Sequence, residues 1–220
     1  MPYTGDVQVG GPPDVLELET LTVTKVAVGP MDNNAYLLRC RRTGGTLLVD
    51  GAAEAETLLA VVGSAGGGRL DGVLTTHRHH DHWSALAHLV QATGAPTWAG
   101  EADAPAIDVP TTTLLRHGDV VRVGQCDAHV VALPGHTPGS VALVLERGSA
   151  APVVLTGDAL FPGGVGRTRS PEDFTSALDA VERELFGPLP DATRVLPGHG
   201  RDTTLGAERP ALEEWRARGW

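Results

Sequence analysis

The sequence has few positively charged side chains, and lysine is almost absent. Its 220 residues carry 27 Asp and Glu against 17 Lys and Arg, Lys25 is the only lysine, and the formal net charge is −10. Binding to nucleic-acid phosphates depends on clustered Lys and Arg. We therefore expect no nucleic-acid partner.

Long apolar runs are also missing. No stretch of about 18 apolar residues is present, so no transmembrane helix is predicted. Residues 1–14 are rich in Pro and Gly and lack the basic and apolar regions of a secretory signal. These absences predict a cytoplasmic protein with no membrane partner.

Cysteine is scarce as well. Cys40 and Cys126 are far apart in the chain and match no zinc-binding pair. We expect both to be buried, reduced thiols.

The chain is long enough to bury a full core, and no linker divides it. We expect one domain over residues 1–220, with a loose leader at 1–19 and a short helical tail at 201–220. Periodicity predicts strands and helices in alternation. The expected strands are 21–28, 34–40, 46–49, 70–75, 96–98, 119–123, 128–133, 141–145, 153–155 and 193–196. The expected helices are 53–62, 81–91, 171–185 (with Ser170 as N-cap) and 207–218. This order favours an α/β (α+β) fold, with mixed sheets covered by helices on their outer faces.

A histidine cluster follows the buried strand at 70–75. His77 and His79 are two residues apart, so on an extended segment they point the same way and can bind one ion. Asp81 and His82 lie where a helix is expected to begin, so they need not bind that ion. The alternative is a solvated, histidine-rich loop.

Three further turns carry similar side chains. His136 follows the strand ending at Leu133, Asp158 follows the strand at 153–155, and His199 follows the strand at 193–196. Each is next to a glycine. Loops at strand ends are where scaffolds usually assemble functional sites, and the agreement of four such loops predicts a metal site.

Together these residues resemble the metallo-β-lactamase-fold hydrolases. The resemblance covers about residues 21–200 and implies a four-layer αββα sandwich with the metal site at one edge of its two sheets. It also implies the ligand sets: His77, His79 and His136 for one ion, Asp81, His82 and His199 for the other, and Asp158 as a bridge.

Seven ligands are too many for one zinc ion, which usually takes four. Shared by two ions about 3.5–4 Å apart, they leave room for a bridging water that becomes the attacking hydroxide. Asp81 has a second role to play, orienting that hydroxide or accepting its proton. The expected cofactors are two divalent ions, zinc first, with iron or manganese as alternatives. Two such ions, two aspartates and a hydroxide leave a net charge of about +1, which favours an anionic substrate.

Two residues near the cluster have competing interpretations. Asp50 follows the strand at 46–49, and the resemblance places it beside the metal site, hydrogen-bonding a ligand histidine. The alternative is a simple Asp-Gly turn. Trp83 either narrows the mouth of the pocket or packs in the core, and we favour packing.

Within the family, the chain resembles short, single-domain glyoxalase II-like proteins. The similar segments are residues 29–38, 157–161 and 164–168. The long glyoxalase II enzymes carry an additional C-terminal helical domain, whereas only about 20 residues follow His199 in this sequence. The resemblance implies hydrolysis of a thioester such as S-lactoylglutathione or a related acyl-thiol. Arg167 could anchor a substrate carboxylate with its planar fork, or be a surface arginine.

Other readings stay open. The chain also resembles persulfide dioxygenases, which hold one iron with residues corresponding to His77, His136 and Asp158. A lactonase or general esterase would use the same attacking water. A purely structural metal module is disfavoured, because structural zinc sites are usually closed and rich in Cys. We favour the hydrolase, because His79 and His199 complete two coordination shells.

Overall fold

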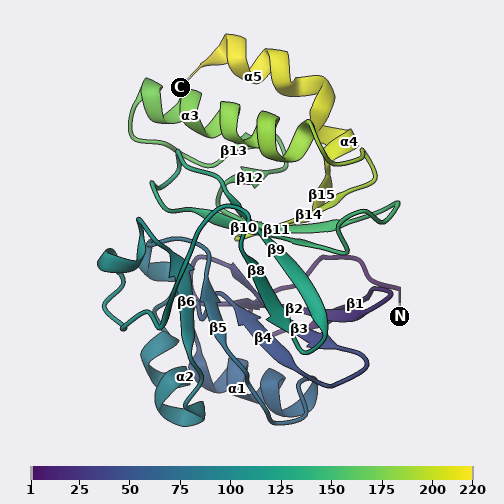
Figure 1. Cartoon of the computed structure of the whole chain (residues 1–220), viewed down its shortest axis with the longest axis vertical. Coiled ribbons are helices and arrows are strands. Elements are labelled where there is room, and N and C mark those ends of the chain that lie inside the picture. Colours follow the sequence, from purple (N-terminus) through teal and green to yellow (C-terminus); the bar gives the residue numbers. More distant parts are fainter. Residues whose placement is uncertain (1, 220) are drawn as a thin grey trace.

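The computed structural model describes residues 2–219, in which two β-sheets pack face to face (Figure 1). The first sheet has the order β1-β2-β3-β4-β5-β6-β7, with strands Asp14–Glu17, Leu21–Val28, Asn33–Cys40, Thr46–Val49, Val73–Thr75, Thr97–Gly100 and Thr113–Leu115. The second sheet has the order β15-β14-β11-β10-β9-β8. Its strands, in chain order, are β8 (Val120–Val123), β9 (Cys126–Ala132), β10 (Val141–Leu145), β11 (Val153–Gly157), β14 (Arg194–Pro197) and β15 (Thr203–Thr204). A small ribbon pairs β12 (Leu160–Phe161) with β13 (Gly164–Val165).

Helices cover the outer face of each sheet. On the first sheet lie α1 (Ala55–Ser64) and α2 (Leu86–Thr93), and on the second lie α3 (Pro171–Val181) and α5 (Leu212–Arg218) (Figure 1). The short helix α4 (Leu205–Glu208) precedes α5. One apolar cluster fills the space between the two sheets. A second lies between the first sheet and its helices, and a third lies between the second sheet and its helices. The predicted four-layer αββα sandwich is confirmed.

Strand β10 shows why a central strand of this fold has a continuous apolar sequence. All five of its residues are buried. Val141, Leu143 and Leu145 face the other sheet, whereas Ala142 and Val144 face the helices. Successive side chains point to opposite faces, so a strand covered on both sides needs apolar residues throughout.

Strand direction brings the candidate ligands to one edge. Strand β9 is antiparallel to β10, β10 is antiparallel to β11, and β11 is parallel to β14. Strands β9, β11 and β14 therefore run the same way, and the loops after them start at the same edge. His136, Asp158 and His199 lie in those loops.

The terminal segments and one helix differ from expectation. The segment predicted as a loose leader contains β1, which pairs with β2 as an edge strand. The predicted tail helix is interrupted by a 3₁₀ turn, Arg209–Ala211, because Pro210 cannot donate a helical hydrogen bond. The helix expected from residue 81 begins only at Leu86, after a 3₁₀ turn, His80–His82. Residues 1 and 220 of the two predicted end segments lie outside the described residues.

The helix at 171–185 is close to the prediction. It begins at Pro171, and the Ser170 hydroxyl accepts a hydrogen bond from Asp173 N at 3.1 Å, as an N-cap does. After Val181 it continues as a π-helical turn, Glu182–Phe186. Within residues 2–219, no helix is both long and apolar enough to cross a bilayer.

Candidate metal centre

The first ligand group consists of His77, His79 and His136. His77 follows β5, and His136 lies in the loop after β9. The Nδ1 atom of His79 is 3.0 Å from His77 Nε2 and 2.9 Å from His136 Nε2. Three imidazole nitrogens from two loops therefore face one point.

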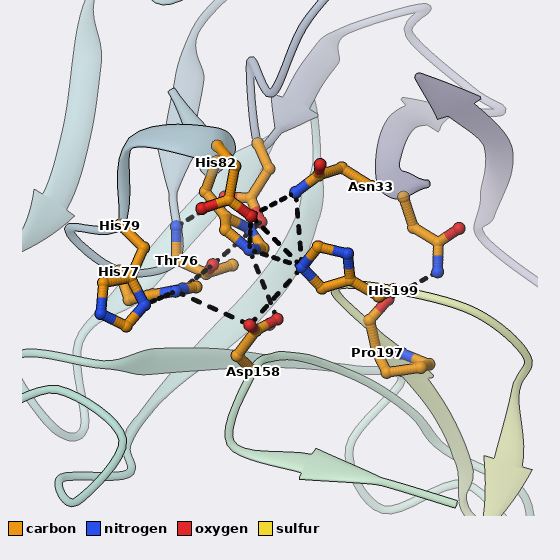
Figure 2. Close-up of polar contacts among 12 residues, drawn as sticks. Asn33, Thr76, His77, His79, His82, Asp158, Pro197 and His199 are labelled. Atoms are coloured by element: carbon orange, nitrogen blue, oxygen red, sulfur yellow. Dashed lines mark hydrogen bonds and ion pairs between the residues drawn. The ribbon is translucent and has the colours of Figure 1, made fainter. Parts of the chain in front are cut away.

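The second ligand group consists of Asp81, His82 and His199. The Nε2 atom of His199 is 3.3 Å from His82 Nε2 and 3.4 Å from Asp81 Oδ2. The Nε2 atom of His82 is 3.5 Å from the same carboxylate oxygen. Figure 2 shows His199 reaching this group from the opposite sheet.

Asp158 lies between the two groups (Figure 2). Its Oδ2 is 3.6 Å from His136 Nε2 and 3.5 Å from His199 Nε2, and its Oδ1 is 3.4 Å from His82 Nε2. Oδ1 is buried and has no hydrogen-bond partner among residues 2–219. A buried carboxylate oxygen without such a partner is costly, and a bound cation would compensate that cost.

Hydrogen bonds on the outer side of the rings fix which nitrogen faces inward. His136 Nδ1 donates to the carbonyl of Arg167 at 2.7 Å, and His199 Nδ1 donates to the carbonyl of Met31 at 2.9 Å. A carbonyl can only accept, so both rings carry a proton on Nδ1, and Nε2 is the nitrogen that faces the site and can bind an ion once it has no proton. This is the tautomer that a metal ligand requires.

Asp50 fixes a third ring in the same way. Its Oδ2 is 2.7 Å from His82 Nδ1, and its carboxylate also accepts from Thr76 N at 2.7 Å and Thr76 Oγ1 at 2.9 Å. The Thr76 hydroxyl in turn lies 3.1 Å from His77 Nδ1. Asp50 has a left-handed backbone, with φ of 63°, a conformation that Asp tolerates better than most residues. The strained turn thus places one carboxylate behind both ligand groups.

The electrostatic environments of the two groups differ. Burial and the neighbouring histidines lower the pKa of His77 and His79, so these rings are neutral. Burial acts in the same direction on the pKa of His82 and His199, but nearby aspartates outweigh it and raise the pKa of each to about 10. Burial would raise the pKa of Asp158, yet its contacts with His199 and His82 lower it. Without a metal ion, the protonated rings of His82 and His199 therefore carry the positive charge that balances the aspartates of the second group.

The donor set fits divalent cations. Three sets of converging donors occur among residues 2–219: His77, His79 and His136; His77, His82 and Asp158; and Asp81, His82 and His199. Imidazole and carboxylate ligands suit zinc, iron and manganese. In the first group, the inward-facing lone pairs of neutral rings repel one another unless a cation lies between them. All seven predicted ligands are brought together.

Asn33 is a site residue to which the sequence assigned no role. Its Nδ2 donates to Asp81 Oδ2 at 2.9 Å and lies 3.4 Å from His199 Nε2 (Figure 2). Asn33 is the first residue of β3, and its backbone forms an isolated bridge with His199. It therefore connects the two sheets at the second ligand group.

Asp103 is a second residue that the sequence did not reveal. This fully buried carboxylate accepts from Arg78 N at 3.0 Å, Gly139 N at 2.9 Å and Thr137 Oγ1 at 2.5 Å. Arg78 lies in the histidine-cluster loop, and Thr137 and Gly139 lie in the His136 loop. Asp103 therefore ties together the two loops of the first ligand group.

Lys25, the only lysine, supports the His199 loop. It is fully buried, and its Nζ contacts Asp202 Oδ1 at 2.8 Å, Gly200 O at 2.9 Å and Gly5 O at 2.7 Å. Tyr3 also donates to Asp202, at 2.7 Å. The N-terminal segment is thus joined to the loop that carries His199.

A cavity of about 440 Å³ opens at the first ligand group. His79, His136, Arg167, Thr168 and Arg169 line it. Both arginine side chains are exposed, so they are free to meet a ligand from solvent. Trp83 does not line this cavity. It packs in the apolar core between the first sheet and its helices, which confirms the favoured alternative, and its Nε1 donates to Arg78 O at 2.9 Å.

Comparisons with known proteins agree with this geometry. Residues 28–199 match the Metallo-beta-lactamase superfamily. A hydroxyacylglutathione hydrolase from Jannaschia sp. (strain CCS1) is 36% identical over 170 residues, which are 76% of this chain and 62% of that protein. Hydroxyacylglutathione hydrolase GloC from Haemophilus influenzae is 30% identical, over 74% of this chain and 83% of its own length.

A solved structure, ETHE1 from Myxococcus xanthus, superposes with a TM-score of 0.72 at 31% identity and covers 85% of this chain and 81% of its own. The fold, the converging donor atoms and the sequence similarity all indicate the same family. The chain belongs to the metallo-beta-lactamase superfamily.

Proposed function

We propose that the protein hydrolyses the thioester bond of a small anionic acyl-thiol, such as S-lactoylglutathione. The observation that carries this proposal is Asp158, whose Oδ2 lies 3.6 Å from His136 Nε2 in the first group and 3.5 Å from His199 Nε2 in the second. The similarity to hydroxyacylglutathione hydrolases supports the thioester. The chain spans 62% of one such enzyme and 83% of another, so the shorter type is the better guide.

Two divalent ions, zinc first, would be held by the seven ligands. His77, His79 and His136 would hold one, Asp81, His82 and His199 the other, and Asp158 would contact both. When bound, such a pair lowers the pKa of a water molecule and polarises a carbonyl. The contribution of the chain is the fixed tautomers and the buried carboxylates that orient the ligands.

Asp81 is the proposed catalytic carboxylate. A hydrogen bond from Asn33 and the proximity of His199 fix its Oδ2 at the edge of the site. Its interaction with His199 lowers the pKa, so the side chain is ionised and a weak base. Orienting a water molecule is therefore its expected role, rather than removing a proton at neutral pH.

Arg167 and Arg169 would bind the carboxylate of the substrate. They lie on the wall of the cavity that also exposes His79 and His136. A cavity of about 440 Å³ lies within the range for a small ligand. A guanidinium offers a carboxylate two parallel hydrogen bonds. Arg167→Ala should raise KM by about 10–100-fold, with kcat little changed, if the contact is worth about 1.5–3 kcal/mol.

A persulfide dioxygenase is the second candidate. The similarity to ETHE1 favours it, and His77, His136 and Asp158 would hold its single iron. The two proposals differ in metal count, metal identity and oxygen use. A lactonase or esterase would share the metal pair and differ only in substrate.

Metal quantification on the purified protein, paired with a panel of thioesters, lactones and glutathione persulfide, separates these functions. About two zinc-type ions per chain with thioester hydrolysis would support the first proposal. One iron with oxygen uptake on the persulfide would overturn it. His79→Ala should remove the ion of the first group, leave about one of two metal equivalents and lower hydrolysis by orders of magnitude, whereas His88→Ala, an exposed histidine paired with Glu56, should change neither.

A further inference from the structure

The two cysteines lie against each other, although 86 positions separate them in the chain. Cys40 ends β3 in the first sheet, and Cys126 begins β9 in the second. Their Sγ atoms are 3.3 Å apart, and both thiols are free. The sequence predicted buried, reduced thiols but did not place them together. Only rotation of the side chains separates this arrangement from a bond between the sheets.

The pair lies at the opposite end of the sandwich from the metal centre. Asn33, the first residue of β3, contacts Asp81, whereas Cys40 is its eighth and last residue. At the usual rise per residue, the strand carries Cys40 roughly 20 Å or more from Asn33. The cysteines are therefore independent of the proposed hydrolytic site.

A cavity beside the pair gives small molecules access to Cys126, and to Cys40 only when the turn that covers it moves. A cavity of about 360 Å³ is lined by both cysteines, by Arg41 and Arg42, and by the residues Glu19, Thr20 and Gln125. Cys126 retains 9% of its surface exposed, whereas Cys40 is fully covered by its immediate neighbours. The cavity has room for several water-sized molecules. Two adjacent arginines favour a thiolate nearby.

The two sulfur atoms have different environments. Burial would raise the pKa of Cys40, but hydrogen bonds from Thr43, from the Gln125 backbone and from Cys126 lower it to about 6. Burial and the hydrogen bond to Cys40 raise the pKa of Cys126 to about 11. The S–H of Cys126 also contacts the carbonyl of Thr20 at 3.3 Å. Cys40 is thus the thiol that ionises more readily, and Cys126 is the one that stays protonated.

Tight packing of two turns holds this arrangement. A Cβ on Gly124 would collide with Thr43 Oγ1 and with Cys40 Cβ, the latter at 2.8 Å. Gly124 has a φ of 60°, a conformation that suits glycine. The turn before Cys126 therefore sits directly on the turn after Cys40, and the thiols meet because nothing larger than glycine separates the turns.

We propose that Cys40 and Cys126 form a redox-active dithiol site that reduces a hydroperoxide and closes to a disulfide between the two sheets. The Cys40 thiolate attacks the peroxide, an S–O bond forms, the O–O bond breaks, and the released hydroxide takes a proton to become water. The Cys126 sulfur then attacks the Cys40 sulfur, the S–S bond forms, and the leaving hydroxide takes the thiol proton. Two thiols and one hydrogen peroxide thus give one disulfide and two waters.

The test is oxidation of the metal-loaded protein by one equivalent of hydrogen peroxide. We expect titratable thiols in denaturant to fall from two per chain to none, with a mass loss of 2 Da in the peptide pair containing Cys40 and Cys126. Peptide mapping separates this loss from the 16 Da gain of a methionine sulfoxide at the exposed Met31. The oxidised protein should melt about 5–10 °C above the reduced protein, because the bond closes a long loop.

Single-cysteine variants identify the order of events. Cys126→Ser should retain the reactive sulfur and give a dimedone-trappable sulfenic acid at Cys40. Cys40→Ser should react with peroxide at least tenfold more slowly. Thr43→Val, which removes one hydrogen-bond donor to Cys40, should fall between wild type and Cys40→Ser. Circular dichroism of each variant checks that it is folded.

Either of two results would overturn the proposal. One is two free thiols after peroxide treatment of folded wild-type protein. The other is a disulfide found only between chains. Metal content should not change on oxidation, so the outcome is separate from the proposed hydrolase function.

Discussion

The two ligand groups share one geometry but differ in what holds their rings in place. In the first group the outer partners are neutral, a threonine hydroxyl behind His77 and the Arg167 carbonyl behind His136. In the second, a buried carboxylate lies behind His82, and Asp81 belongs to the group itself. The first group therefore presents neutral nitrogens, whereas the histidines of the second group are surrounded by more carboxylates. A divalent ion is attracted more strongly to the second, whereas the first depends more on rigid positioning.

Removing the residue that both groups share should have the largest effect. In Asp158→Ala, the carboxylate facing both groups is lost, so we expect affinity for both ions to fall at least about a hundredfold and turnover to fall further. Metal analysis after dialysis, with activity on a thioester, measures both. Wild-type metal content in this variant would contradict its place between the groups.

A matched pair of variants should break one group at a time. His136→Ala should remove the ion of the first group, and His199→Ala the ion of the second, so each should keep about one of two metal equivalents. His88→Ala is the control for losing an imidazole. If either variant lost all metal, the two groups would form a single site rather than two.

Asp50→Asn tests the electrostatic difference between the two groups, because it leaves every candidate ligand in place. The amide keeps the shape of the side chain but removes the charge behind His82, so affinity of the second group should fall about 10–100-fold. The first group should be less affected, because it contacts Asp50 only through Thr76. Titration against a competing chelator measures both affinities, and equal losses would refute the distinction.

Asp103→Asn should have the smallest effect on metal and a measurable one on stability. The variant loses the charge that accepts hydrogen bonds from both loops of the first group, which should cost about 1–3 kcal/mol of unfolding free energy. Urea unfolding of the metal-free protein provides the measurement. Asp179→Asn, an exposed carboxylate paired with Arg216, should stay within about 0.5 kcal/mol of wild type.

The sequence predicted which candidate ligands come together, because the loops that carry them follow strands with a strong apolar signal. The strands before His136 and His199 end in short apolar runs, Val130 to Leu133 and Val195 to Leu196, and their turns contain glycine. Asp103 was missed because two of its three hydrogen-bond partners are backbone N–H groups, which carry no residue signature. Lys25 was noted for its rarity alone, since nothing local indicates the ion pair with Asp202, 177 positions away.

Errors in the fold came from segments whose structure depends on distant partners. Strand β1 alternates only weakly in burial and is fixed by pairing with β2, so the leader appeared irregular. Helical spacing after His82 was real, but the site requires Asp81 and His82 to turn inward, and the regular helix starts later. The contact between Cys40 and Cys126 requires two turns from different sheets to meet, and the hydrophobic periodicity of the sequence does not indicate such long-range contacts. The cytoplasmic location stays a prediction.

The burial of Lys25 gives the molecule an internal reporter of unfolding. A protease specific for lysine has a single target bond in the whole chain, and that bond lies in the middle of β2 with its side chain fully covered. Cleavage into two fragments can then occur only when the first sheet has opened. The rate of appearance of those fragments would follow the population of open molecules with or without added metal.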